Sequence, residues 1–404
     1  MNEPIVIVGA SQAGLQVAES LRAEGHEGPL TMVGDESHPP YQRPPLSKAL
    51  LTGESTEDRL ILRGRDLLER RNIELITGVR VDAIERAGRI VRLADGRGLA
   101  YGGLALTTGG RARTLSIPGA GLDGVVTLRT LEDSRRIAAG IAQATSVAVV
   151  GGGFIGLEIA AAARKAGKPV VVFEALDRLL ARSSAPFVSD FFFALHKAHD
   201  VDIRLGTQVV ALEGKDRVAG VTTNDGRTQP ADLVVVGVGI VPNSELAQAC
   251  GIACDRGIVV DDCSRTSDPA VVAAGDCTAR RMPDRSLLRL ESVQNAIEQG
   301  KSAAAALLGR ARPFTAAPWF WSDQYDVRLQ MAGLSSGHDR IVVRGEPDAR
   351  RFSVFYFRGE QLIAVDSINR APDHIATRKL LDAGRSPTFE QAGDAAFALA
   401  ALLK

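Results

Sequence analysis

Two glycine-rich turns in this chain have the residue types and spacing that bind the pyrophosphate of a dinucleotide. Each turn follows an apolar run, Ile5–Val8 in the first copy and Val147–Val150 in the second. The fingerprint positions are Gly9, Ser11 and Gly14 in the first copy, and Gly151, Gly153 and Gly156 in the second. Such glycines permit a tight bend, a close approach of the backbone to the phosphates, and close packing of the next helix. The N–H groups and the positive dipole at the start of that helix bind the phosphates. Two fingerprints in one chain therefore predict two dinucleotides, with electrons passing between them.

An acidic residue follows the second strand of each copy, where a carboxylate can accept hydrogen bonds from ribose hydroxyls. Glu174 lies 23 positions after Gly151, close to the usual spacing of roughly 20. Asp35 or Glu36 takes this place in the first copy. Ser11 stands where the second glycine is usual, so the backbone is less free to approach the first dinucleotide. A single turn of this kind also occurs without a ligand, but the repeated order of strand, helix and acidic strand end favours two binding sites.

The composition excludes several other classes of protein. The 48 basic and 48 acidic residues cancel, so there is no overall positive field for nucleic acid. No apolar run reaches the length of a membrane span, and the first strand begins at Ile5 without a cleavable signal before it. The cysteines lack the spacing of a redox pair or a metal site; they are Cys250, Cys254, Cys263 and Cys277. These features predict a cytoplasmic enzyme with free thiols that binds no nucleic acid, membrane or metal.

The 404 residues exceed what a single core organises, and the patterns divide them into four segments. The predicted segments are 1–113, 114–240, 241–318 and 319–404. The run Val271–Cys277 and a helix over 290–309 carry no fingerprint of their own, so we expect them to complete the first nucleotide unit. In the last segment RIVVR, RRFSVFYF and QLIAVDSI predict three strands, with a turn at 358–360. Two helices are expected to follow, around 373–383 and 388–403.

Motifs beside the fingerprints resemble a known family. YQRPPLSKALL follows the first acidic strand end, GGGFIGLE holds the second fingerprint, and AAGDC, RLESVQNA and PWFWSDQ follow in that order. Over essentially all of its length the chain resembles the FAD-dependent NADH:ferredoxin reductases of bacterial oxygenase systems, of the putidaredoxin reductase and biphenyl dioxygenase ferredoxin reductase type. Mammalian apoptosis-inducing factor is a more distant relative. The resemblance implies an α/β fold with two Rossmann-like dinucleotide-binding domains of the glutathione-reductase type. Residues 1–113 and 241–318 would bind FAD, 114–240 would bind NADH, and 319–404 would form a small α+β domain.

The resemblance also implies which residues bind the cofactors. Those matched to FAD are Gly9, Ser11, Gly14, Asp35, Glu36, Arg43, Lys48, Asp276, Glu291, Ser292, Val293 and Trp321. Those matched to NADH are Gly151, Gly153, Gly156 and Glu174. Further predicted cofactor-binding residues are Ala13, Thr108, Gly109, Arg129, Phe154, Ile155, Arg182 and Gly239. Glu174 should disfavour the 2′-phosphate of NADPH by like charge, although Arg178 and Arg182 lie near enough in sequence to reduce that penalty.

Lys48 and Glu158 are predicted to form a catalytic pair. Glu158 stands where the first repeat has Gln16. In the catalytic interpretation Lys48 of the FAD domain meets Glu158 of the NADH domain near the nicotinamide, orients both rings and holds its charge near flavin N5. In the alternative, Glu158 only stabilises the first turn of its helix through the helix dipole.

The chain lacks the thiols that other enzymes of this fold use. Disulfide reductases place a C-x4-C pair, and flavin peroxidases and NADH oxidases a single cysteine, where this chain has Tyr41-Gln42-Arg43. Electrons must therefore leave singly or go to oxygen or quinone. The resemblance favours transfer from NADH through FAD to a 2Fe–2S ferredoxin that supplies a haem-thiolate monooxygenase or a ring-hydroxylating dioxygenase. The alternatives are an NADH oxidase or quinone reductase, and a redox-sensing interaction protein like apoptosis-inducing factor.

Candidate docking residues for the ferredoxin are Lys301, which we expect to open a helix, and Arg378 and Lys379 in the last segment. By resemblance these residues line the face nearest the flavin edge, but basic residues on helix faces are often only solvated. The second choice is the group of arginines Arg63, Arg65, Arg70 and Arg71. The protein is expected to be a monomer or a weak dimer.

Overall fold

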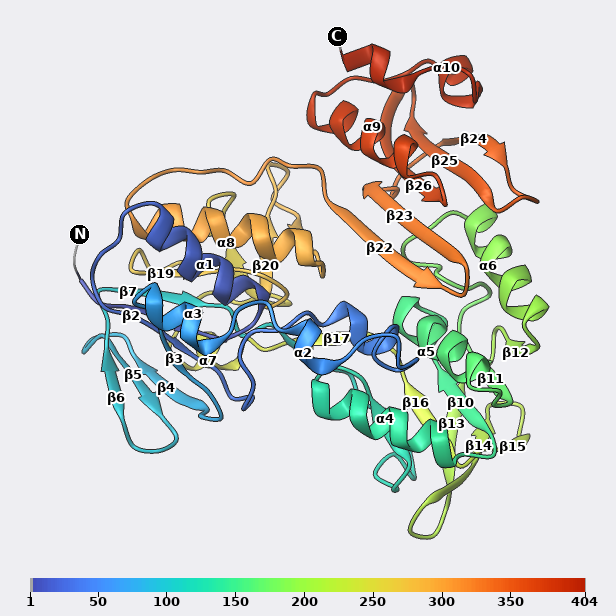
Figure 1. Ribbon diagram of the computed structural model, residues 1–404, viewed down its shortest axis with the longest axis horizontal. Helices are drawn as coiled ribbons and strands as arrows, with labels where there is room; N and C mark the ends of the chain where they lie inside the picture. The colour runs from blue at the N-terminus through green and yellow to red at the C-terminus, as the bar shows by residue number, and fades with distance from the viewer. Residues whose placement is uncertain (1–2, 404) are drawn as a thin grey trace. The chain divides into compact units, whose positions relative to one another are not determined.

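The computed structural model describes residues 3–403 and forms two compact units (Figure 1). Unit 1 consists of the described residues up to Gln42, then Asp58–Arg111 and Val241–Pro318. Unit 2 consists of Arg43–Glu57, Ala112–Ile240 and the described residues from Trp319 onward. The short elements α2 (Glu57–Leu60), β8 (Gly110–Ala112) and β17 (Ile240–Pro242) lie where the chain passes from one unit to the other. No helix among the described residues is long and apolar enough to cross a membrane.

Unit 1 is built on a five-stranded parallel sheet in the order β19-β7-β1-β2-β3. Its strands are β1 (Ile5–Val8), β2 (Leu30–Val33), β3 (Glu74–Ile76), β7 (Gly103–Leu106) and β19 (Val271–Ala273). Ile5 and Ile7 pack in one core cluster with residues of helices α1 (Gln12–Ala23) and α8 (Val293–Leu307). Val6 and Val8 pack in a second cluster. Because alternate residues of β1 enter different cores, the whole strand must be apolar.

The smaller elements of unit 1 surround this sheet. They are α3 (Arg65–Arg70), β4 (Val81–Glu85), β5 (Ile90–Leu93), β6 (Gly98–Ala100), α7 (Glu245–Ala249), β18 (Ile258–Val260), β20 (Thr278–Arg281) and β21 (Leu287–Leu288). The β4, β5 and β6 strands form an antiparallel sheet that contributes Val81, Ile84 and Val91 to the second cluster. The predicted return of 271–277 and 290–309 to the first nucleotide unit is confirmed, since β19 pairs with β7 and α8 packs on α1.

Unit 2 repeats the parallel-sheet architecture in the order β12-β11-β10-β16-β9. Its strands are β9 (Val125–Thr127), β10 (Val147–Val150), β11 (Val170–Phe173), β12 (Val201–Arg204) and β16 (Leu233–Val236), and its helices are α4 (Leu131–Gln143), α5 (Phe154–Lys165) and α6 (Pro186–Ala198). An antiparallel sheet of β13 (Val209–Gly214), β14 (Val218–Thr223) and β15 (Thr228–Pro230) adjoins it in sequence. The short 3-10 helix η1 (Pro44–Ser47) contacts α4 and α5, which explains why residues 43–57 belong to this unit.

The chain ends in an antiparallel sheet covered by helix α9 (Ala371–Asp382), drawn in red in Figure 1. The sheet order is β22-β23-β26-β25-β24. Its strands are β22 (Trp319–Gln324), β23 (Val327–Gly333), β24 (Arg340–Glu346), β25 (Arg351–Arg358) and β26 (Gln361–Ile368). The predicted α/β fold with two Rossmann-like cores and a C-terminal α+β part is therefore confirmed. The three predicted strands are present, and two further strands, β22 and β23, were not predicted.

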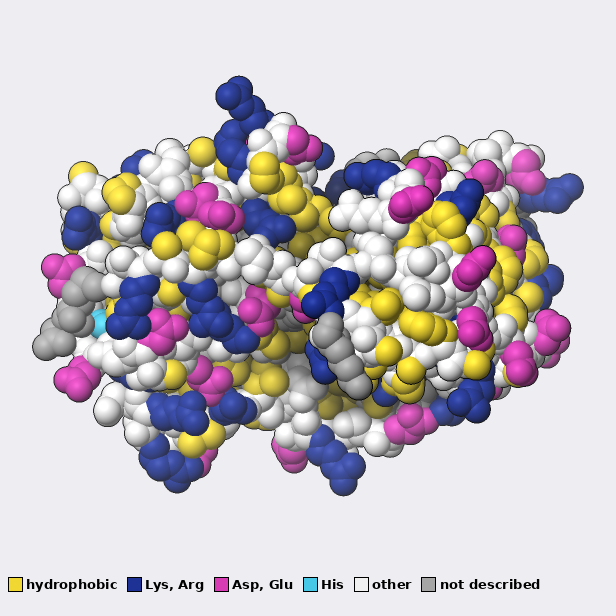
Figure 2. All heavy atoms as spheres, turned by 90° about the horizontal axis from the view of Figure 1, so that it is seen from above, with side chains coloured by type: hydrophobic (Ala, Val, Ile, Leu, Met, Phe, Trp, Pro, Cys, Tyr) yellow, Lys and Arg dark blue, Asp and Glu magenta, His cyan; other side chains and the backbone are white. Residues whose placement is uncertain are grey.

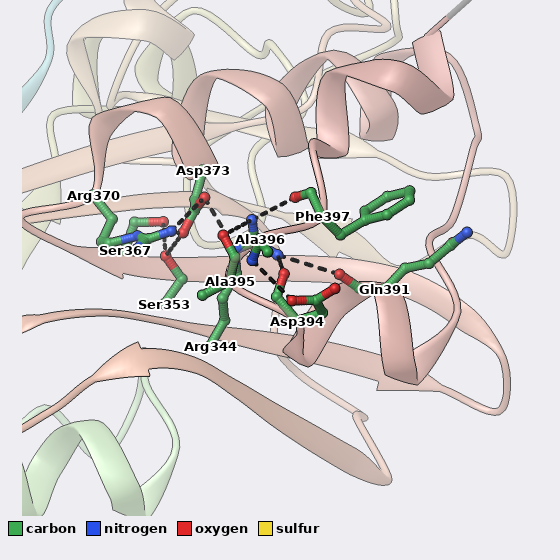
Figure 3. Close-up of polar contacts among 10 residues, drawn as sticks. All are labelled: Arg344, Ser353, Ser367, Arg370, Asp373, Gln391, Asp394, Ala395, Ala396 and Phe397. Carbon is green, nitrogen blue, oxygen red and sulfur yellow. Dashed lines mark hydrogen bonds and ion pairs between the residues drawn. The ribbon is translucent and has the colours of Figure 1, made fainter.

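The predicted helix over 388–403 is wrong. The structure has a short α10 (Phe389–Gly393) and a 3-10 helix η2 (Leu399–Leu403), separated by extended backbone at Asp394. The buried Arg344 explains this break, because its guanidinium donates hydrogen bonds to the carbonyl groups of Gln391, Asp394, Ala395 and Phe397 (Figure 3). Arg344 also lies 3.3 Å from Asp373 of α9. These bonds satisfy carbonyl groups that a continuous helix would otherwise pair internally.

Candidate functional site

The first glycine-rich turn joins β1 to α1 in unit 1. Gly9 has a φ of +114°, and a Cβ atom on Gly14 would lie only 2.0 Å from the carbonyl oxygen of Gly9. Only glycine therefore lets α1 begin so close to β1. Ser11, the N-cap residue of α1, makes no side-chain hydrogen bond to the helix. The first N–H groups of α1, beside the buried Ala13, are thus without a side-chain cap and suited to a phosphate.

The end of β7 contacts the same turn. The Thr107 hydroxyl donates to the carbonyl oxygen of Gly9 at 2.9 Å, and the Thr108 hydroxyl donates to that of Asn243 at 2.5 Å. Gly109, the next residue, has a φ of +63°. Thr107 is absent from the predicted residues, although paired threonines after an apolar strand are the signal that could have identified it.

A second loop of unit 1 follows β19 and carries the half-buried Asp276. The N–H of Gly275 donates to Oε1 of Gln299 at 2.8 Å, and the Thr278 hydroxyl donates to the carbonyl oxygen of Gly275 at 2.8 Å. Gln299 lies in α8 and is buried. It therefore fixes the loop that holds Asp276, a role that no local sequence signal predicts.

The remaining predicted residues of unit 1 lie at the ends of elements. Glu36 follows β2, and its Oε2 accepts a hydrogen bond from the Tyr41 hydroxyl at 2.5 Å. Ser292 is the N-cap residue of α8, and its side chain accepts from the N–H of Asn295 at 3.1 Å. Glu291 accepts from Arg289 at 2.7 Å. Val293 is the first residue of α8, and Asp35 lies in the loop after β2.

The second glycine-rich turn joins β10 to α5 in unit 2 and has the same construction. A Cβ atom on Gly156 would lie 2.1 Å from the carbonyl oxygen of Gly151, as for Gly14 and Gly9 in the first copy. Gly153 is the N-cap residue of α5, without a side-chain cap and with open space where a side chain would stand. Two predicted residues follow it in the first turn of α5: Phe154 packs on Phe320 at 4.9 Å between ring centroids, and Ile155 is exposed.

Glu174 lies directly beside this turn. Its Oε2 accepts from the N–H of Gly152 at 2.6 Å, and its Oε1 accepts from the N–H of Leu176 at 2.8 Å. Arg178 donates instead to the carbonyl groups of Ala181 and Ser184 and to the Ser189 hydroxyl. Arg178 is therefore engaged with its own loop, whereas Arg182 is exposed. Gly239, with a φ of +101°, follows β16.

The predicted pair of Lys48 and Glu158 is present, and both residues belong to unit 2. Lys48 Nζ lies 2.9 Å from Glu158 Oε1, and the Glu158 side chain is almost fully buried. Ser47 and Ser322 also donate hydrogen bonds to this carboxylate, Ser322 at 2.6 Å. Burial raises the pKa of Glu158, and Lys48, Ser322 and Ser47 oppose that rise.

The alternative prediction, that Glu158 only stabilises the first turn of its helix through the helix dipole, is wrong. Glu158 is the fifth residue of α5, and the first turn of this helix holds no acidic residue. Its carboxylate is therefore held by side-chain donors rather than by the unpaired N–H groups at the helix start. Ser47 and Ser322 are absent from the predicted residues. Ser322 belongs to the WSDQ motif noted in the sequence, which is the signal that could have identified it.

The other predicted flavin neighbours of unit 2 lie in two places. Arg43 Nη1 donates to the carbonyl oxygen of Arg129 at 2.7 Å, so these two predicted residues come together. Trp321 lies in β22, with its ring 5.5 Å from that of Trp319.

The candidate docking residues lie on two helices. Lys301 belongs to unit 1, in the middle of α8 rather than at a helix start as expected, and is paired with Glu298 at 2.7 Å. Arg378 and Lys379 belong to α9 of unit 2, and Arg378 lies 5.4 Å from the centre of the Trp319 ring. Among the second-choice arginines, Arg63 and Arg71 both contact Glu19. Figure 2 shows Lys and Arg side chains mixed with Asp and Glu side chains over the face seen there.

The four cysteines are free thiols. Cys263 and Cys277 are buried, and Cys250 and Cys254 are half-buried. Burial raises the pKa of Cys277 to about 11 and also raises the pKa of the other three. All four thiols are therefore protonated at neutral pH and poor nucleophiles.

Comparison with known proteins assigns the chain to a family. Residues 3–300 match the model described as pyridine nucleotide-disulphide oxidoreductase, and residues 319–403 match the model described as reductase C-terminal. The chain therefore belongs to the pyridine nucleotide-disulphide oxidoreductase family.

Several relatives are similar over nearly their whole length. Rhodocoxin reductase of Rhodococcus erythropolis is 47% identical, over 98% of this chain and 93% of the relative. Putidaredoxin reductase CamA of Pseudomonas putida is 44% identical, over 94% of this chain and 92% of the relative. The crystal structure of the ferredoxin reductase for the CYP199A2 system from Rhodopseudomonas palustris has a TM-score of 0.96 at 43% identity, over 98% of this chain and 99% of that chain. The crystal structure of the covalent putidaredoxin reductase–putidaredoxin complex has a TM-score of 0.95 at 42% identity, over 100% of this chain and 98% of that chain.

Proposed function

We propose that this protein is an FAD-containing NADH:ferredoxin reductase that supplies electrons to an oxygenase. The observation that carries the proposal is the pair of dinucleotide turns, one in each unit, each with a helix start that has no side-chain cap. The names of the relatives support the same conclusion, since they describe a rhodocoxin reductase, a putidaredoxin reductase and the ferredoxin reductase for the CYP199A2 system. A protein with two dinucleotides and no reactive thiol pair has to pass its electrons to an external acceptor.

The residues of the two turns fit the two dinucleotides. Gly9, Ser11 and Gly14 would hold the pyrophosphate of FAD at the start of α1, and Asp276 would contact the cofactor from the loop after β19. Gly151, Gly153 and Gly156 would hold that of NADH at the start of α5. Both assignments use the same physical feature, because backbone N–H groups without a side-chain cap bind an anion at a helix start. Bound FAD supplies hydride acceptance from NADH and electron release in single steps.

Lys48 and Glu158 would orient the nicotinamide end of NADH. Glu158 is buried and accepts from three side chains, Lys48, Ser47 and Ser322, which hold the Lys48–Glu158 pair in place. A charge held in a fixed place assists hydride transfer without reorganisation during the reaction. Glu174 would accept hydrogen bonds from the adenosine ribose of NADH and repel a 2′-phosphate.

The ferredoxin would dock through basic residues. Arg378 and Lys379 are our first candidates in unit 2, and Lys301 is the candidate in unit 1. An acidic partner is attracted to such residues, which raises association rates more than affinity. We further propose a cytoplasmic location, since four free thiols are typical of a reducing compartment.

Electron-acceptor assays test the proposed function. Anaerobic stopped-flow mixing of the FAD-loaded protein with NADH should show rapid loss of flavin absorbance. In steady state, a 2Fe–2S ferredoxin with cytochrome c as reporter should be reduced faster than oxygen or a quinone. Turnover that is fastest with oxygen or quinone, and unchanged by ferredoxin, would identify an oxidase or quinone reductase instead. Reduction by NADH without turnover on any acceptor would favour a redox-sensing interaction protein.

A further inference from the structure

A chain of buried polar side chains extends from Glu158 to helix α6. Ser322, Gln324 and His196 are each at most 1% exposed. Ser322 Oγ lies 2.6 Å from Glu158 Oε1, and Gln324 Nε2 lies 3.1 Å from Ser322 Oγ. His196 Nε2 lies 2.8 Å from Gln324 Oε1. A polar group buried this deeply costs folding free energy unless it forms a hydrogen bond. Each contact in the chain therefore restricts how the next group can be oriented.

The direction of every hydrogen bond in this chain follows from its end at Glu158. The carboxylate paired with Lys48 can only accept, so Ser322 must donate its proton to Glu158. The Ser322 oxygen is then free only to accept, which requires the NH2 group of Gln324 to face it. The amide oxygen of Gln324 must therefore face His196, and His196 must carry its proton on Nε2.

The far end of the chain agrees with this direction. With its proton on Nε2, His196 has an acceptor at Nδ1, and the Tyr325 hydroxyl lies 3.3 Å from that atom. Tyr325 has a φ of +55°, a conformation that tyrosine rarely adopts. Its ring stacks on His199 with 3.6 Å between centroids. The stacking and the hydroxyl contact hold Tyr325 in a strained conformation beside His196.

The charge state of His196 also agrees with a ring that carries a single proton on Nε2. Burial, with a smaller contribution from the neighbouring His199, lowers the pKa of His196 to about 4, although the bond to Gln324 acts the other way. His196 is therefore neutral near pH 7 and has one donor and one acceptor, as the chain requires. Among the described residues, the charged and titratable groups that face the chain are Lys48 at Glu158, and His199 and Tyr325 at His196. Arg164 in turn acts on Tyr325.

We propose that Ser322, Gln324 and His196 are positioning residues for hydride transfer, because their one-directional hydrogen bonds hold Glu158 ionised and aligned with Lys48. This inference rests on the proposed function for the role of Glu158. Without the donor on His196, the Gln324 amide can turn over and present its oxygen to Ser322. Ser322 would then divide its proton between two acceptors, and Glu158 would lose part of one donor.

Replacement of His196 tests this role. His196→Leu removes the donor to Gln324, whereas His196→Gln keeps an N–H at a similar position. His374→Leu is a matched control, because His374 is also buried, burial likewise lowers its pKa to about 4, and it has no bond to the chain. The rate of flavin reduction by NADH, measured by stopped flow across pH, is the first readout, and the Kd of NADH is the second.

We expect His196→Leu to slow flavin reduction about tenfold at neutral pH, the effect of one lost hydrogen bond, with little change in the Kd of NADH. The rate should recover as the pH rises, because Glu158 is then ionised without the missing donor. His196→Gln and His374→Leu should stay near the wild-type rate. Equal losses in both leucine variants at every pH would show a structural role only, and a wild-type rate in His196→Leu would overturn the proposal.

Nitrogen NMR of histidine-labelled protein supplies a readout that does not depend on turnover. The signal that disappears in His196→Gln should be that of a neutral ring protonated on Nε2, and it should not titrate between pH 5 and 8. A ring protonated on Nδ1, or one that titrates near the ordinary histidine pKa of about 6.5, would overturn the chain. If wild-type flavin is not reduced by NADH, the proposed function fails, and the NMR spectrum still decides whether the chain exists.

Discussion

The carboxylate of Glu174 accepts a hydrogen bond from the backbone N–H of Gly152 at 2.6 Å, so the acid after β11 is tied directly to the dinucleotide turn. This contact places a negative charge beside the second fingerprint. Arg182 follows in the same loop region of the sequence and is exposed, and we propose it as the cation that would face a 2′-phosphate. We propose that the preference between NADH and NADPH depends on the balance between these two side chains.

Glu174→Ala should reduce the preference for NADH over NADPH. Loss of the carboxylate removes the ribose acceptor and the repulsion of the 2′-phosphate, so the ratio of the two kcat/KM values should fall about tenfold, equivalent to about 1.4 kcal/mol. Steady-state kinetics with both nucleotides measures this ratio. Asp177→Ala, which removes an exposed acid from the same loop, should leave it unchanged. An unaltered preference in Glu174→Ala would argue against the assignment.

Gly14→Ala should lower the FAD content of the purified protein. The added Cβ would lie 2.0 Å from the Gly9 carbonyl oxygen, and backbone at that distance must move. We expect the turn to shift, with a stability loss of about 1–3 kcal/mol. Flavin absorbance per protein and thermal unfolding measure both effects. Gly121→Ala is the control, since a Cβ there would stand in open space; equal flavin content in the two variants would contradict the prediction.

Glu158→Gln should slow flavin reduction by NADH while the Kd of NADH changes little. The substitution keeps the side-chain shape but removes the charge that faces Lys48, and we expect a loss of about tenfold. Burial raises the pKa of Glu158 above its ordinary value of 4.5. The wild-type rate should therefore fall on acidification at a pH above 4.5, and this fall should be absent from Glu158→Gln. A stopped-flow pH profile that is the same for both proteins would count against the role.

Asp366 should make the folded protein less stable as the pH rises. Burial raises the pKa of this carboxyl to about 7, and the Tyr356 hydroxyl donates to it at 2.6 Å. An acid whose pKa is higher in the folded state binds its proton more tightly there. The contribution of Asp366 to the free energy of unfolding is therefore complete below the ordinary aspartate pKa of 3.8. It is lost as the pH rises toward the folded-state pKa of about 7.

Denaturant unfolding of the wild type and Asp366→Asn across pH 4–8 measures this effect. The amide cannot ionise, so the variant should gain stability relative to the wild type by a few kcal/mol between the ends of that range. The physical reason is that each tenfold difference in proton affinity between the folded and unfolded chain corresponds to about 1.4 kcal/mol. A difference between the two proteins that does not change with pH would refute the prediction.

Charge reversal at the docking residues should weaken turnover with ferredoxin. Arg378→Glu, Lys379→Glu and Lys301→Glu are each expected to raise the KM for ferredoxin about threefold to tenfold and to weaken its dependence on salt. Flavin reduction by NADH should not change. Lys215→Glu, an exposed lysine between β13 and β14, is the control. If the docking variants keep the wild-type KM for ferredoxin and its salt dependence, the docking face lies elsewhere.

The amino-acid sequence by itself determined the two nucleotide turns, the strands beside them and three strands of the last segment. The turn Gly9–Gly14 and its repeat at 151–156 depend on neighbours only a few residues away, so glycine spacing after an apolar strand is sufficient to predict them. The apolar runs RIVVR, RRFSVFYF and QLIAVDSI within 340–368 likewise predict strands from local information. The break at Asp394 was not predictable in this way, because it depends on Arg344, a residue far away in the chain.

Only the tertiary structure decided which polar residues act together. Ser322 and Glu158 are 164 positions apart, and His196 and Gln324 are 128 apart, yet they form one chain of hydrogen bonds. The pair of Lys48 and Glu158 was predicted from the sequence, but its supporting donors Ser47 and Ser322 were not. A hydrogen bond requires its donor and acceptor to lie within about 3 Å of each other. Because packing brings such partners together from distant parts of the chain, no local sequence pattern indicates them.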